Sequence, residues 1–127
     1  MRKLILGAML GAMATPVMAS NWFTFSTIKD GTTDALETET ISKGGDYRTA
    51  WVKTDFVNNP NKISQQRMLT YYNCSNRTFA VKSLLTYYTS GQNKVENFEV
   101  LNFMPEAPDT IGEKGYTLVC GLDLSKR

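Results

Sequence analysis

Short segments of alternating polar and apolar residues constrain the fold of this chain more than any other feature. Beyond residue 20, these segments are rich in aromatic and β-branched residues, and Gly, Asn and Pro turns separate them. Alternation with a period of two is typical of strands that bury one face of a sheet. Six segments show it: residues 21–28, 36–41, 47–56, 63–74, 77–88 and 95–103. Within the third segment, we expect Trp51 to anchor the core.

The end of the chain carries signals for a helix. Thr110 and Glu113 have the spacing of a capping box, in which two side chains satisfy the first backbone N–H groups of a helix. Gly121 falls where a C-terminal cap is expected. Across this segment, one helical stripe of apolar residues comprises Ile111, Leu118, Val119 and Leu122.

A terminal strand remains the alternative to this helix. Tyr116, Leu118 and Cys120 alternate as they would on a strand, and each of Gly112 and Gly115 weakens a helix by roughly 1 kcal/mol relative to Ala. The capping box and the apolar stripe favour the helix. The sequence therefore predicts an α+β fold, a small antiparallel β-sheet of about six strands with one C-terminal helix packed on it.

The first nineteen residues have the pattern of a secretory signal peptide. Arg2 and Lys3 precede an apolar run over residues 4–14, and residues 17–19 form a small-x-small cleavage site. Glycines and a proline interrupt the run, which is shorter than the roughly 20 residues of a membrane span. We therefore expect a signal peptide at 1–19, a mature domain at 20–127, and export to the periplasm, the cell surface or the exterior. No Cys lies at the cut, so we expect no lipid anchor.

The charge balance argues against nucleic acid as a partner. The chain has 14 basic and 12 acidic residues, and two of the basic residues, Arg2 and Lys3, belong to the predicted leader. The mature domain would then carry equal numbers of both signs. A general electrostatic attraction to phosphate backbones has no basis in such a domain.

Cys74 and Cys120 are the chain's two cysteines, and the chain has no His. In an exported protein a single pair favours a disulfide, with free thiols as the alternative. Two thiolates without His cannot complete a four-ligand zinc site unless carboxylates join them. We expect neither a metal nor another cofactor.

The absence of His also excludes Ser-His-Asp and Cys-His catalytic arrangements. Paired carboxylates are the remaining candidates for acid–base chemistry, namely Glu37 with Glu39 and Glu96 with Glu99. Such spacing on a strand is more typical of solvated charges. The sequence therefore predicts a protein without enzymatic activity.

Two kinds of surface residue are candidates for binding. A basic patch for acidic glycans would comprise Lys53, Arg67, Arg77 and Lys82. The consecutive tyrosines at 71–72 and 87–88 are the second kind, because alternation turns one ring of each pair outward. We expect Tyr72 and Tyr87 to face outward as interface residues, although Tyr87 also shares parity with the apolar Val81 and Leu85.

The order of these features resembles the surface-adhesin protein E family of Gram-negative bacteria. The residues that carry the likeness are an N-terminal aromatic strand, the 47–51 strand followed by Val52 and Lys53, Cys74-x-x-Arg77-x-Phe79, the 87–91 hairpin and a Pro-rich step to Cys120. Membership implies an antiparallel sheet backed by a disulfide-tethered C-terminal helix, the ability to form a homodimer, and binding of host matrix and plasma proteins.

Two functions follow as expectations. The first is an exported, adhesin-like binding module that recognises a protein partner, either a host matrix or plasma protein or an envelope component. The second is a periplasmic inhibitor or accessory subunit of another envelope protein.

Overall fold

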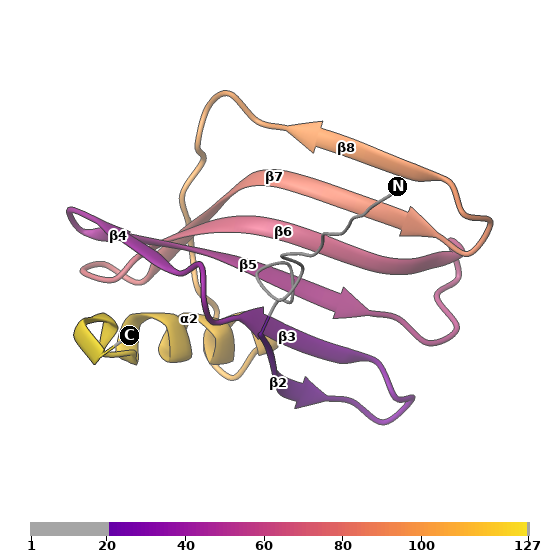
Figure 1. Ribbon diagram of the computed structural model, residues 1–127, viewed down its shortest axis with the longest axis horizontal. Helices are drawn as coiled ribbons and strands as arrows, with labels where there is room; N and C mark the ends of the chain where they lie inside the picture. Colours follow the sequence, from indigo (N-terminus) through magenta and orange to yellow (C-terminus); the bar gives the residue numbers. More distant parts are fainter. Residues whose placement is uncertain (1–20, 127) are drawn as a thin grey trace, which may run out of the picture.

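The computed structural model describes residues 21–126. The predicted signal peptide and its cleavage site lie outside the described residues. The chain forms one antiparallel sheet and a C-terminal helix, drawn in Figure 1. The elements are β2 (Trp22–Thr27), β3 (Thr33–Glu37), β4 (Ser42–Gly44), β5 (Tyr47–Asp55), β6 (Ile63–Asn73), β7 (Thr78–Tyr88), β8 (Asn93–Asn97), β9 (Met104–Pro105), α2 (Ile111–Gly121) and the 3-10 turn η2 (Leu124–Lys126).

The sheet follows the chain order closely. Its main path runs β2-β3-β5-β6-β7-β8, while β4 pairs with β5 and β9 pairs with β7. All these pairings are antiparallel, as short turns between consecutive strands require. The prediction of a small antiparallel sheet with one C-terminal helix is confirmed.

Two strand boundaries differ from the prediction. The segment 36–41 does not form a strand throughout, because β3 ends at Glu37. The Glu37 carboxylate accepts the backbone N–H groups of Glu39 and Thr40, so a local turn replaces the ladder bonds there. The segment 95–103 is likewise divided between the short strand β8 and a loop that leads to β9.

The helix begins where the capping box predicts. Thr110 is the N-cap, and its hydroxyl accepts the Glu113 N–H at 3.2 Å, while the Glu113 carboxylate accepts the Asp109 N–H at 2.9 Å. At the other end the cap is Leu122 rather than Gly121. Arg48 of β5 donates to the carbonyls of Val119 at 2.6 Å and Leu122 at 2.7 Å. A cation therefore satisfies the negative end of the helix dipole.

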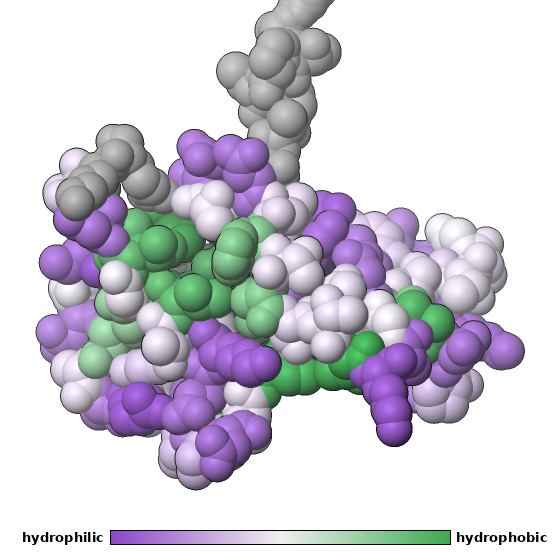
Figure 2. All heavy atoms as spheres, turned by 90° about the horizontal axis from the view of Figure 1, so that it is seen from below, coloured by the Kyte–Doolittle hydropathy of each residue, from purple (hydrophilic) through white to green (hydrophobic). Residues whose placement is uncertain are grey.

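The core lies between α2 and one face of the sheet. The helix buries Gly115, Tyr116 and Val119, whereas Ile111 and Leu122 of the predicted apolar stripe are exposed. The buried apolar residues packed in this cluster are Leu36, Ile41, Ala50, Val52, Tyr72, Tyr116 and Val119. Figure 2 shows further apolar side chains gathered on the side of β2 and α2. Phe23, Phe25 and Leu118 line a groove there.

Three interactions fix α2 to the sheet at one end. Cys74, just beyond β6, forms a disulfide with Cys120, as predicted. The Tyr116 hydroxyl donates to the Asn73 carbonyl at 3.0 Å, and Arg48 caps the helix from β5. The helix is thereby held by its C-terminal half. No helix among residues 21–126 is long and apolar enough to cross a membrane.

Removal of the disulfide should destabilise the domain substantially. The two half-cystines are 46 residues apart, and a constraint over such a loop is worth about 4 kcal/mol on the chain-entropy model. We expect Cys74→Ala to lower the free energy of unfolding by roughly 2–5 kcal/mol in urea denaturation. Wild-type protein in reductant is the control and should unfold at the same midpoint as the variant. Equal stability of oxidised wild type and variant would contradict this prediction.

Candidate protein-binding face

The face of the sheet that points away from α2 carries a second group of large side chains. Ala50 and Val52 of β5 belong to the core beneath α2, so Trp51 between them points to the opposite face. We call this opposite face the distal face. In register, Trp51 pairs with Leu69 and Lys53 pairs with Arg67, which places all four residues on the distal face.

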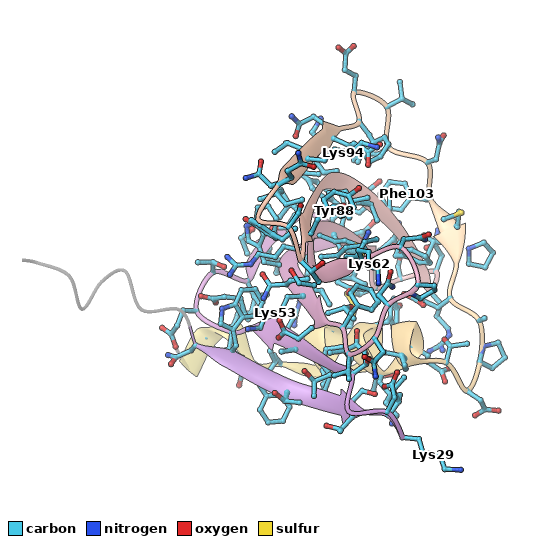
Figure 3. All side chains as sticks on the ribbon, turned by 90° about the vertical axis from the view of Figure 1, so that its right-hand side faces the viewer. Lys29, Lys53, Lys62, Tyr88, Lys94 and Phe103 are labelled. Carbon is cyan, nitrogen blue, oxygen red and sulfur yellow. A yellow bond between two sulfur atoms is a disulfide. The ribbon has the colours of Figure 1, made fainter. Side chains whose placement is uncertain are left out.

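Two cations stack against aromatic rings on the distal face. The Arg67 guanidinium carbon lies 5.4 Å from the ring centroid of Trp22 and 5.7 Å from that of Tyr87. The Lys53 ammonium lies 4.8 Å from the Trp22 ring, and Lys53 is labelled in Figure 3. Trp22, Trp51, Lys53, Arg67 and Tyr87 are hereafter called the aromatic–basic cluster. Four strands supply it, since Trp22 lies on β2 and Tyr87 on β7.

The polar partners of the two cations differ. Lys53 forms an ion pair with Asp55 at 3.4 Å. Arg67 donates from Nε to Gln65 at 2.7 Å, and no acidic side chain of residues 21–126 lies within ion-pair distance of it. The two terminal nitrogens of Arg67 therefore keep their capacity to donate to a carboxylate or carbonyl of a partner.

A shallow cavity of about 280 Å³ opens beside Arg67. Trp22, Trp51 and Leu85 form its apolar walls, and Glu37 and Thr40 close one side. The Glu37 carboxylate is committed to its own turn, because it accepts the N–H groups that end β3. Aromatic walls next to a guanidinium with free donors provide a partner with both apolar contact area and directional hydrogen bonds.

The structure overturns the outward placement of Tyr72. Only 5% of this residue is exposed, and its ring meets that of Tyr116 edge-on with centroids 6.1 Å apart. Burial raises the pKa of the Tyr72 phenol, and the nearby Glu106 carboxylate raises it further. The parity argument failed because both faces of β6 carry apolar residues: Leu69 and Tyr71 lie on the distal face, while Tyr72 lies beneath α2.

Trp51 and Tyr87 occupy the distal face instead. Trp51 is half-buried there and is not part of the core beneath α2, contrary to the expectation of a core anchor. Tyr87 is half-buried and contacts Arg67, which leaves it available as an interface residue. No pattern in the sequence brings Trp22 and Arg67 together, because 45 residues separate them and only the pairing of the strands joins them.

The predicted basic patch does not form as one surface. Lys53 and Arg67 are register neighbours on the distal face. Arg77 instead bonds Glu113 at the start of α2 at 2.5 Å, and Lys82 donates to the Phe98 carbonyl at 3.1 Å. Among residues 21–126 there is also no group of three or more acidic, His or Cys side chains arranged to hold a metal ion.

Comparison with solved structures shows that this chain shares its fold with a bacterial protein. One crystal form of Haemophilus influenzae protein E matches with a TM-score of 0.54 and 13% identity, covering 69% of this chain and 80% of that chain. Its selenomethionine form gives the same score and identity over 77% and 85%. Protein E from non-typeable Haemophilus influenzae gives 0.51 and 12% over 81% and 86%. Structural similarity at this identity establishes the fold alone.

The family assignment comes from the sequence profile. Residues 22–121 match the model of the family described as surface-adhesin protein E. The chain belongs to the surface-adhesin protein E family, which confirms the resemblance and supports an adhesin-like role. No curated protein sequence matches the chain.

Replacing the two tyrosines separately should distinguish core from surface. We expect Tyr72→Ser to cost about 3–5 kcal/mol, as large-to-small substitutions of buried aromatic residues do. Tyr87→Ser should cost about 1 kcal/mol or less, because its ring is part-exposed and packs against the part-exposed Arg67 side chain. Thermal and urea unfolding measure both. Similar losses in the two variants would show that Tyr87 is as buried as Tyr72.

Proposed function

We propose that this protein is an exported, non-catalytic binding module whose aromatic–basic cluster contacts a protein partner. The observation that carries the proposal is the meeting of Trp22, Arg67 and Tyr87 within cation–π distance on one sheet face. Trp, Tyr and Arg are the residue types that dominate binding energy at protein interfaces. They combine a rigid apolar surface with directional hydrogen-bond donors.

The free donors of Arg67 indicate what the partner presents. A carboxylate or a pair of carbonyls at the shallow cavity would satisfy the guanidinium, while apolar partner atoms would cover the ring faces. Membership of an adhesin family supports a partner outside the cell, a host matrix or plasma protein. An envelope component bound by a periplasmic inhibitor or accessory subunit is the alternative, and cellular location separates the two.

The sheet edges offer a route to a homodimer. The main path of the sheet ends at β2 and β8, and β8 exposes Val95 by 58%. An unpaired edge with an exposed apolar residue favours pairing with another strand. Tyr87 is the member of the aromatic–basic cluster next to β8, since it pairs with Asn93. A dimer formed through the β8 edge would leave the cluster available to a separate partner.

Removal of two side chains of the cluster should weaken binding without unfolding the domain. We expect Arg67→Ala combined with Tyr87→Ser to weaken binding to a responsive member of a panel of immobilised matrix and plasma proteins by about tenfold or more, measured by surface plasmon resonance. Lys94→Ala is the matched control, because it removes an exposed cation of β8 whose nearest acid is 3.8 Å away. Equal losses in control and double variant would indicate non-specific charge effects, and unchanged binding by the double variant would contradict the cluster's role.

Export should leave a defined mature terminus. The cleavage pattern predicts that protein from the native host begins at Ser20, which intact mass spectrometry measures directly. Antibody labelling of intact cells, compared with fractionated cells, would then locate the protein. Surface labelling supports the adhesin, whereas recovery from the periplasm alone supports the accessory role. Retention of Met1, or a lipid adduct, would contradict the predicted export route.

A further inference from the structure

A second cavity lies on the opposite side of the sheet, beneath the N-terminal half of α2. Its volume is about 140 Å³. The sheet contributes Phe25 and Val52 among others, and Ile111, Gly112 and Gly115 contribute the helix side. Because two of these helix residues lack side chains, the backbone of α2 forms a flat wall. A Cβ at Gly115 would lie 3.4 Å from both Phe25 and Tyr72, so a larger side chain at this position would occupy the cavity.

The cavity is apolar with acidic groups at two points. Beyond the residues above, its lining comprises Asp34, Met68, Thr70, Tyr72, Phe79, Val81 and Glu106, and includes no Lys or Arg. Asp34 accepts the hydroxyl hydrogen of Thr54 at 2.5 Å and is thereby partnered. The other carboxyl group belongs to Glu106.

Glu106 is buried without a side-chain partner. Only 9% of the residue is exposed, and its backbone N–H donates to the Arg77 carbonyl at 3.0 Å, which holds it beside the start of β7. None of the hydrogen bonds or ion pairs among residues 21–126 reaches its carboxyl oxygens. Its Oε1 lies 2.9 Å from the position a Gly112 Cβ would take, so the group points to the cavity wall.

The Arg77 charge acts on this carboxyl group, but Arg77 forms no ion pair with it. The Arg77 guanidinium bonds Glu113 and lies 5.2 Å from the Tyr116 ring centroid, outside the cavity lining. Burial raises the pKa of Glu106; the Arg77 charge acts against this rise and the Glu113 charge adds to it. A buried carboxylate with no partner is costly, and a bound cation would remove that cost.

We infer that this cavity is a binding site for a small organic cation, a primary ammonium group on a short apolar chain, with Glu106 as its counter-ion. The ammonium donates to the Glu106 carboxylate in the wall, and the apolar chain fills the space between Phe25, Phe79 and Val81. A dry cavity of about 150 Å³ is known to hold a ring of six carbons, so this volume suits about five or six heavy atoms.

Butylammonium chloride is the direct probe, with 1-butanol as a neutral ligand of the same length. We expect saturable shifts of the Gly112 and Gly115 amide resonances with butylammonium in the millimolar range, in the protein with its disulfide intact. 1-Butanol should bind about tenfold or more weakly, since it lacks the charge-assisted hydrogen bond. Equal affinity for both probes, or no shift with either, would overturn the site.

Glu106→Gln tests the counter-ion. This isosteric change should weaken butylammonium binding about tenfold or more and leave 1-butanol binding unchanged. Glu99→Gln is the matched control, because it removes an exposed carboxylate from the loop after β8 and should not alter either affinity. If Glu106→Gln binds butylammonium as the wild type does, the proposal fails. The probe comparison in the wild type decides the matter independently if this variant does not fold. The distal face takes no part in either measurement, so partner binding there can succeed or fail separately.

Discussion

The attachment of α2 to one end of the sheet is the constraint on which the rest of this structure depends. A disulfide, a tyrosine hydroxyl bond to Asn73 and the Arg48 cap all act within the C-terminal half of the helix. A domain of this size has few apolar residues to bury, so a helix that covered either face with equal stability would leave the core undefined. The attachment selects one face as core. It thereby determines which side chains remain for binding on the other.

Local signals predicted most of the fold, whereas the choice of buried face required tertiary contacts. The capping box placed the start of α2 correctly, because Thr110 and Glu113 bond backbone groups only a few residues away. The tyrosine assignment illustrates the limit. Along β6, apolar residues occupy both faces, so alternation alone does not show which face the helix will cover. Tyr72 is buried because α2 packs there. The one signal near it in the sequence is Cys74, two residues further along, whose disulfide to Cys120 attaches the helix at this end of β6.

The aromatic–basic cluster was beyond sequence prediction for a related reason. Its members come from four strands, and an alternating pattern specifies the face of a residue within its own strand but not its neighbours across the sheet. Strand register brings Lys53 beside Arg67, and the β2–β3–β5 order brings Trp22 over both. The sequence alone therefore suggested that the basic residues of these strands form one patch. In the structure, Arg77 serves the helix while Arg67 keeps free donors.

Family membership transfers the architecture of this protein more securely than its partner. The compared Haemophilus structures share 12–13% identity with this chain, yet they match most of its length. Identity that low preserves a pattern of buried positions and few surface side chains, so specificity must be read from the surface of this chain. Its two faces differ in chemistry: the distal face presents a guanidinium stacked on aromatic rings, and the cavity beneath α2 presents an unpartnered carboxyl group. One layer of sheet separates them. The disulfide holds the far end of α2, whereas the N-terminal half, which lines the cavity, is held by the Thr110–Glu113 cap, the Arg77–Glu113 ion pair and packing. A ligand in that cavity would thus reinforce the end of the helix that the disulfide does not reach.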